Sequence, residues 1–227
     1  MASRVIHLAV AHELVKRLGI DDTERFYFGH VLPDMILGEY EYRLKTKKAT
    51  HFYTLLPNGR KTYDFLRFCD EYRDKLSDML YLGYYVHLIE DNIFRQYLYY
   101  KVGLLYRRGQ KELLDELYAD YHLLNPLLRE RYDITLPIVP EGIESEPVFK
   151  RFEFMMSDWL DDMKSDLTEH PDGELLHFTK ELIFEFIDEC ADVITKEVKA
   201  LGRGEHFLTL DDYSIENYNS TKDNKGE

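Results

Sequence analysis

The hydrophobic positions along the chain repeat at the spacing of α-helices. Between Ser3 and Gly19 apolar residues stand three to four apart, with Ser3 suited to cap a helix and Gly19 to end it. Further helical patterns run over 61–76, from Gly109 to about Tyr132 with a kink or break expected at Pro126, through Phe152 and Met163, and from Leu176 to about Gly202. Because no segment shows convincing strand alternation, the sequence predicts an all-α fold.

The chain shows no change of composition that demands two domains. Its length of 227 residues suffices for one substantial core. We therefore expect a single-domain multi-helix bundle over 1–210, followed by a polar, mobile tail over 211–227.

The stretch from Tyr81 to Phe94 is apolar on all sides of a predicted helix, which is typical of a buried helix. Gly83, His87 and Asp91 stand four residues apart on one face, and Gly83 would leave space for another ligand above the imidazole. A carboxylate carried into the interior needs a cation or several donors, and a divalent metal meets both side chains. Alternatively, His87 and Asp91 bond each other or a backbone carbonyl in a satisfied core.

Charge and cysteine content exclude several classes of function. The formal net charge of −14 disfavours electrostatic capture of extended nucleic acid or of anionic lipid surfaces. Cys69 and Cys190 form neither a disulfide framework nor a thiolate metal site. The start of the chain lacks a secretory signal and no stretch is long and apolar enough for a membrane span, so we expect a soluble, cytoplasmic protein.

Three more candidate ligands precede the central helix. His7 lies on the buried side of the first predicted helix, where a satisfied core histidine is the alternative. Asp34 follows Pro33 in a loop or at a helix start, where it could simply be an N-cap. His51 follows a basic run, Arg43, Lys45, Lys47 and Lys48, that is suited to attract an anionic substrate group.

Two other histidines carry weaker signals. His30 could be a ligand or a surface residue, and we prefer the interpretation as a surface residue. His177 and Glu181 stand one turn apart on the last predicted helix, where an exposed, ion-paired face is the preferred interpretation over a second metal site. Whether this pair or Asp120 takes part in a site stays open.

Four short motifs occur in a fixed order, and together they resemble the zinc-dependent phospholipase C family, which is similar in fold to the single-strand-specific zinc nucleases. They are His7-Leu8-Ala9-Val10-Ala11, the segment from Gly29 to Asp34, Thr50-His51-Phe52, and the segment from Tyr81 to Asp91. The resemblance covers residues 3–95.

The resemblance implies a metal site where several helices converge. Asp34, His51, His87 and Asp91 would hold one zinc, and Asp91 would bridge to a second ion shared with His7. We expect one ion, with two as the alternative, because the residues that hold a third zinc in the family have no counterpart here. The implied activity is hydrolysis of a phosphoester by metal-activated water, with Asp34 as the catalytic residue that orients or deprotonates the water. The expected partner is a small phosphate-containing substrate or a phospholipid head group.

Three rival interpretations remain. A phosphohydrolase of the His-Asp type needs a histidine followed directly by aspartate, and none of the nine histidines has one. A non-catalytic helical module would use a structural or degenerate metal site and act through a partner. A helical protein without any metal is the third.

Overall fold

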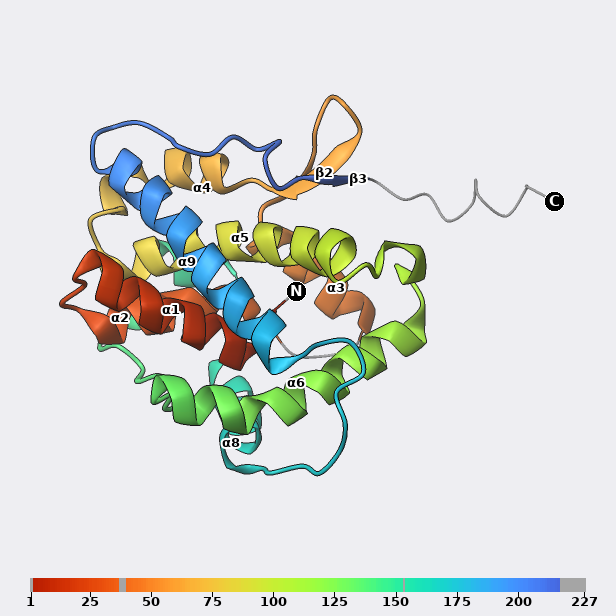
Figure 1. Ribbon diagram of the computed structural model, residues 1–227. Helices are drawn as coiled ribbons and strands as arrows, with labels where there is room; N and C mark the ends of the chain where they lie inside the picture. Colours follow the sequence, from red (N-terminus) through yellow and green to blue (C-terminus); the bar gives the residue numbers. More distant parts are fainter. Residues whose placement is uncertain (1, 37–39, 153, 217–227) are drawn as a thin grey trace.

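The computed structural model describes residues 2–36, 40–152 and 154–216, and this part of the chain is predominantly helical (Figure 1). The predicted all-α fold is confirmed, with one small sheet as its exception in the described ranges. The longer elements, in chain order, are α1 (Arg4–Leu18), α2 (Thr23–Val31), α3 (Tyr40–Thr50), β1 (Tyr53–Leu55), β2 (Arg60–Tyr63), α4 (Phe65–Glu71), α5 (Met79–Gln96), α6 (Lys111–Tyr132), α7 (Pro147–Arg151), α8 (Met156–Thr168), α9 (Lys180–Leu201) and β3 (Ile215–Glu216). Short single turns between them are η1 (Leu32–Asp34), η2 (Arg73–Lys75), η3 (Tyr97–Lys101), η4 (Leu105–Arg107) and η5 (Ile143–Ser145).

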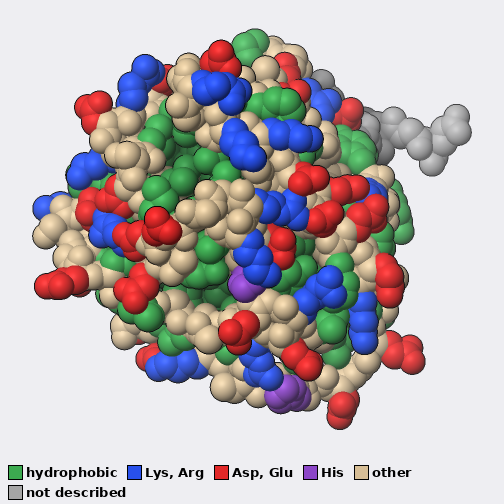
Figure 2. All heavy atoms as spheres, turned by 60° about the vertical axis from the view of Figure 1, so that its left-hand side comes forward, with side chains coloured by type: hydrophobic (Ala, Val, Ile, Leu, Met, Phe, Trp, Pro, Cys, Tyr) green, Lys and Arg blue, Asp and Glu red, His purple; other side chains and the backbone are tan. Residues whose placement is uncertain are grey.

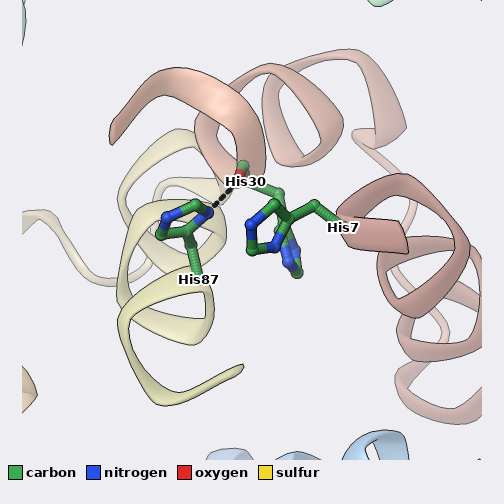
Figure 3. A group of neighbouring side chains, drawn as sticks. All are labelled: His7, His30 and His87. Atoms are coloured by element: carbon green, nitrogen blue, oxygen red, sulfur yellow. Dashed lines mark hydrogen bonds between the residues drawn. The ribbon is translucent and has the colours of Figure 1, made fainter. Parts of the chain in front are cut away.

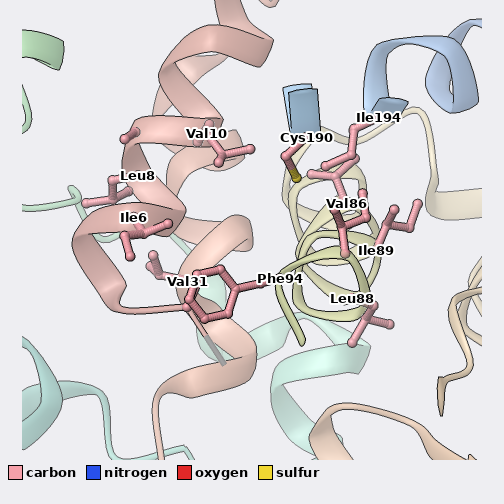
Figure 4. Packing of buried hydrophobic residues seen from close by; sticks show 14 of the residues in the cluster. Ile6, Leu8, Val10, Val31, Val86, Leu88, Ile89, Phe94, Cys190 and Ile194 are labelled. Carbon is pink, nitrogen blue, oxygen red and sulfur yellow. The ribbon is translucent and has the colours of Figure 1, made fainter. Parts of the chain in front are cut away.

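Helix α5 lies at the centre of the molecule, as its all-round apolar pattern predicts. Every residue from Leu80 to Arg95 is buried. Helix α2 packs along α5, and α1 and α9 cover the neighbouring sides (Figure 1). Apolar side chains from these four helices interdigitate, with Ile6 and Val31 on one side and Val86 and Ile194 on the other (Figure 4).

Two glycines allow α2 and α5 to touch through their backbones. A Cβ atom at Gly29 would lie 2.0 Å from Leu80 O, and one at Gly83 would lie 2.4 Å from Phe26 O. Such distances exclude any side chain, so both positions require glycine. The expectation that Gly83 leaves space for a metal ligand is therefore wrong. The space is filled by the backbone of α2.

A small antiparallel sheet, β1-β2-β3, interrupts the helical bundle. The Pro57-Asn58-Gly59 turn joins β1 to β2, with Gly59 at φ 80° and Leu56 N donating to Arg60 O at 2.7 Å. The helix predicted over 61–76 is wrong, because Arg60 to Tyr63 extend into β2 and only 65–71 form α4. These strands are too short for alternation to be visible in the sequence.

The C-terminal part of the described chain packs on this hairpin. Ile215 pairs with Lys61 to form β3, so the polar tail expected from 211 begins with six residues that are part of the fold. The remainder, 217–227, lies outside the described residues. Helix α6 continues without a break through Pro126 to Tyr132, in contrast to the break considered there.

The surface carries both signs of charge. Figure 2 shows lysine and arginine side chains interspersed with aspartate and glutamate over one face of the molecule. Within the described ranges, no helix combines the length and apolar character that crossing a bilayer requires.

Candidate metal centre

All five predicted ligands meet inside the bundle. His7 comes from α1, Asp34 from η1, His51 from the residue after α3, and His87 and Asp91 from α5. The four residues other than Asp34 are fully buried, and the Asp34 side chain is 9% exposed. The structure therefore brings together side chains from four separate segments of the sequence.

Four of these side chains form a first set of candidate ligands. His51 Nε2 lies 3.3 Å from Asp34 Oδ1, 3.1 Å from His87 Nε2 and 3.4 Å from Asp91 Oδ2. His87 Nε2 lies 3.9 Å from Asp91 Oδ2. Tetrahedral ligands with metal bonds of about 2.0–2.2 Å stand about 3.3–3.6 Å from each other. Asp34, His51 and His87 each offer a ligand atom within 4.8 Å of the other two and could hold a metal ion, with Asp91 Oδ2 beside both histidines.

His7 and the second oxygens of the two carboxylates form a second set. His7 Nε2 lies 3.6 Å from Asp34 Oδ2 and 3.7 Å from Asp91 Oδ1. The backbone N–H of Ala2 also donates to Asp91 Oδ1, at 3.3 Å. Asp34 and Asp91 thus each direct one oxygen to the first set and the other oxygen to the second set. Carboxylates that bridge two metal ions are arranged in this way.

The three histidines direct the same nitrogen, Nε2, to the centre because their Nδ1 atoms have other contacts. His87 Nδ1 donates to His30 O at 2.7 Å (Figure 3), and His51 Nδ1 lies 3.0 Å from Lys47 O. His7 Nδ1 lies 3.0 Å from Glu90 Oε1. Histidine ligands of metals are oriented in this way by carbonyl or carboxylate oxygens behind the ring.

Five buried side-chain atoms of the centre have no hydrogen-bond partner among the described residues: His7 Nδ1, His7 Nε2, His30 Nδ1, Glu90 Oε1 and Asp91 Oδ2. Of these, His7 Nε2 and Asp91 Oδ2 belong to the candidate ligand sets. A buried carboxylate oxygen or imidazole nitrogen without a partner costs about 1–3 kcal/mol. A divalent cation bound to both would remove this cost, so the donor set of the described residues fits a metal ion. Of the core alternative, the bond between His87 and Asp91 is not formed at their 3.9 Å separation, whereas the bond from His87 to a backbone carbonyl, His30 O, is formed.

His30 and Glu90 also belong to this centre, and the sequence interpretation missed them. His30 is fully buried rather than on the surface, and its Nε2 lies 2.6 Å from Glu90 Oε2. Glu90 therefore sits between His30 and His7 (Figure 3 shows the two rings beside His87). A signal was present in the sequence, because Glu90 is a charged residue on a helix with no polar side.

The electrostatics of the centre favour the protonation states that metal ligands need at His87, Asp34 and Asp91, but not at His7. Burial lowers the pKa of His7, but Glu90, Asp91 and Asp34 outweigh it and raise the pKa above its usual value. Burial lowers the pKa of His87 well below its usual value, and the neighbouring His7 adds to this effect. Burial raises the pKa of the Asp34 carboxyl, but Lys47, whose Nζ lies 2.5 Å away, and His51 and His87 outweigh it and hold the pKa well below its usual range. The pKa of Asp91 is also lowered, since contacts with His51 and His87 outweigh its burial. Neutral imidazole and charged carboxylate are the forms that bind metal.

The remaining sequence candidates lie outside the centre. His177 precedes α9 rather than lying on it, and its Nε2 contacts Glu116 at 2.6 Å instead of Glu181. Asp120 accepts the backbone N–H groups of Leu176, His177 and Phe178, which fixes the loop before α9. Both are structural contacts.

Comparison of the chain with protein-family models, with curated proteins and with solved structures gave no match. We therefore infer the function of the protein from the geometry of these side chains.

Proposed function

We propose that this protein is a zinc-dependent phosphoester hydrolase of the kind that its motifs resemble, the zinc-dependent phospholipases C. The observation that carries the proposal is that His51 Nε2 lies 3.1–3.4 Å from atoms of Asp34, His87 and Asp91, with Asp91 Oδ2 left without a hydrogen bond among the described residues. Two imidazoles and two carboxylates make a ligand set that suits zinc. His7 would share a second ion with Asp91 and Asp34.

The residues of the centre would have two roles, binding the metal ions and orienting the attacking water. Zinc held by such a set polarises a phosphoryl oxygen and supplies hydroxide near neutral pH. His7, His51, His87 and Asp91 are fully buried and would hold the metal ions together with Asp34. Asp34 is the most exposed of the five, so its carboxylate can accept a hydrogen bond from the attacking water and orient it. Lys47 lies beside Asp34 and supplies a positive charge for the phosphoryl group.

The substrate class follows from size and charge. The metal centre and Lys47 attract a small anionic phosphoester, whereas the overall charge of −14 opposes the binding of a long polyanion. We therefore propose a small phosphodiester or phosphomonoester, or a phospholipid head group.

The test combines metal analysis with an activity screen. Purified full-length protein should contain one or two zinc ions per chain by inductively coupled plasma mass spectrometry, and it should hydrolyse p-nitrophenyl phosphate or bis-p-nitrophenyl phosphate. Chelation should abolish hydrolysis and added zinc should restore it. Hydrolysis that persists at full rate after the metal has been removed would overturn the proposal.

A structural metal site is the second candidate, because the first ligand set already contains four protein atoms. Closed sites with four protein ligands are typical of structural zinc, whereas catalytic sites keep a position for water. Cobalt substitution separates the two. If phosphate changes the visible spectrum of the cobalt form, the ion has an open position and the enzyme is favoured. An unchanged spectrum favours a binding module.

A further inference from the structure

Arg95 is a buried cation that lacks an anionic partner. It is 7% exposed, and it is the one lysine or arginine that is buried within the described ranges. Its Nη2 donates to the Asn92 side chain, its guanidinium lies over the Tyr63 ring at 3.8 Å from the ring centre, and its Nε has no partner there. A buried charge without a counter-ion costs several kcal/mol. The arrangement therefore points to an anion from outside the chain.

Other cations gather at the same place. Lys61 and Tyr63 are two residues apart on β2 and so lie on the same face of the sheet. Burial lowers the pKa of Lys61 to about 8, and the charges of Arg108, Arg95 and Lys48 add to this effect. These positive side chains repel one another here, and the charges that shift the pKa of Lys61 are all positive.

Tyr63 connects this basic group to the metal centre. Its ring is covered by Arg95, and the centre of the ring also lies 5.1 Å from the centre of the His51 ring. Asn92 holds Tyr63 in place, since its side chain accepts from Tyr63 N and donates to Tyr63 O, both at 2.9 Å. Arg95 follows Asp91 by one helical turn on α5, a rise of about 6 Å.

We propose that Arg95 and Lys61 bind a phosphate group of the substrate other than the one that is hydrolysed. That this phosphate belongs to the substrate rests on the proposed function, whereas the binding of phosphate at Arg95 does not. A guanidinium pairs with two phosphate oxygens at once, and two cations match the charge of a phosphate dianion. The substrate would then be a small phosphoester with an additional phosphate roughly one helical turn, about 6 Å, from the reacting phosphorus.

The first test measures binding without metal or turnover. Full-length protein freed of metal with chelator is titrated with inorganic pyrophosphate and, separately, with citrate in a calorimeter. Pyrophosphate should bind the wild type, and Arg95→Gln and Lys61→Gln should each weaken it at least tenfold. Arg95→Lys should restore part of the affinity. Arg131 is a matched control, because it also stacks on a ring, that of Phe184 at 4.1 Å, and Arg131→Gln should change nothing.

Equal affinity in the wild type and both variants would overturn the proposal, and citrate binding as tightly as pyrophosphate would overturn its restriction to phosphate. If Arg95→Gln does not fold, Lys61→Gln on the partly exposed strand still decides the outcome.

The second test uses zinc-loaded protein and compares p-nitrophenyl thymidine 5′-phosphate with and without a phosphate at the 3′ position. The extra phosphate should lower KM at least tenfold in the wild type, and Arg95→Gln should remove this difference while kcat changes less than twofold. If the wild type hydrolyses neither compound, the proposed function fails and the calorimetry still decides the role of Arg95. If both are hydrolysed with equal KM, the proposal of a second phosphate fails alone.

Discussion

The Nε2 atoms of His51 and His87 lie 3.1 Å apart and face each other in the interior. Two neutral imidazoles in this position either share one proton or direct two lone pairs at each other. A cation that accepts both lone pairs stabilises the arrangement, and Asp34 and Asp91 supply the compensating charge. A metal ion bound between these two nitrogens would therefore also stabilise the fold.

Zinc should stabilise the protein against unfolding. At free zinc about 100-fold above its dissociation constant, the free energy of unfolding should rise by about 2.7 kcal/mol over the metal-free form, because only the folded chain assembles the ligands. Urea denaturation with zinc or with chelator measures the difference. His87→Ala should abolish this gain, whereas His170→Ala, at an exposed residue, should keep it.

Glu90→Gln should weaken the ion at His7 selectively. The Glu90 carboxylate contacts His7 Nδ1 at 3.0 Å, and loss of such a supporting carboxylate lowers metal affinity about 10–100-fold. Competition with a chromogenic chelator should show one weakened ion and one unchanged ion. The control is Glu116→Gln, which alters a similar contact, with His177 at 2.6 Å, away from the centre. Two equally weakened ions would contradict this role.

Asp34→Asn should lower turnover far more than metal content. The amide keeps one oxygen for the metal but loses the charge that orients water, so we expect kcat to fall by about 10²–10⁴-fold. Mass spectrometry of bound zinc, carried out on the same preparations as the kinetics, separates the two effects. Asp162→Asn, at an exposed partner of Arg4, should leave both values unchanged. Unchanged hydrolysis in Asp34→Asn would show that the assigned role is wrong.

Gly83→Ala should destabilise the fold although alanine favours helices. The new Cβ would lie 2.4 Å from Phe26 O and 2.8 Å from His30 N, both backbone atoms that cannot move away alone. We expect a loss of about 3 kcal/mol in the free energy of unfolding. At Gly202 the nearest atom is 3.6 Å away and φ is −61°, so Gly202→Ala should stabilise by about 0.5 kcal/mol.

Lys61→Met should raise stability at pH 7. The folded-state pKa of about 8 lies below the ordinary 10.5, so the unfolded chain binds this proton more tightly. The free energy of unfolding of the wild type should therefore rise as the pH increases from about 8 to 10.5, and below pH 8 the full cost of the charged side chain is present. After solvent screening we expect a gain of about 1 kcal/mol for the variant. Lys111→Met, at an exposed residue, should change neither stability nor its pH dependence.

Local sequence patterns were sufficient for several long helices, such as α1 and α5, and insufficient at 61–76 and where the backbone or a distant partner decides. Ser3, Gly19 and the apolar run around His87 specify α1 and α5 directly. The candidate ligands were predicted from the order of their motifs, together with the need of His87 and Asp91 for partners on a buried helix. His30 was missed because its role depends on Glu90, which is 60 residues away along the chain. The role of Gly83 depends on the backbone of α2, which no local pattern shows.

Because α5 carries His87, Asp91 and Arg95 on successive turns, this one helix would, under the proposed function, set both the position of the reacting group and the distance to the second phosphate. Inserting a single residue between Asp91 and Arg95 would rotate the arginine by about 100° around the helix axis. Arg95 would then no longer share a helix face with the residues of the metal centre, and the second phosphate would be lost from its binding position. New substrate preferences would therefore have to arise in the hairpin that bears Lys61, where length and sequence can vary without turning the helix.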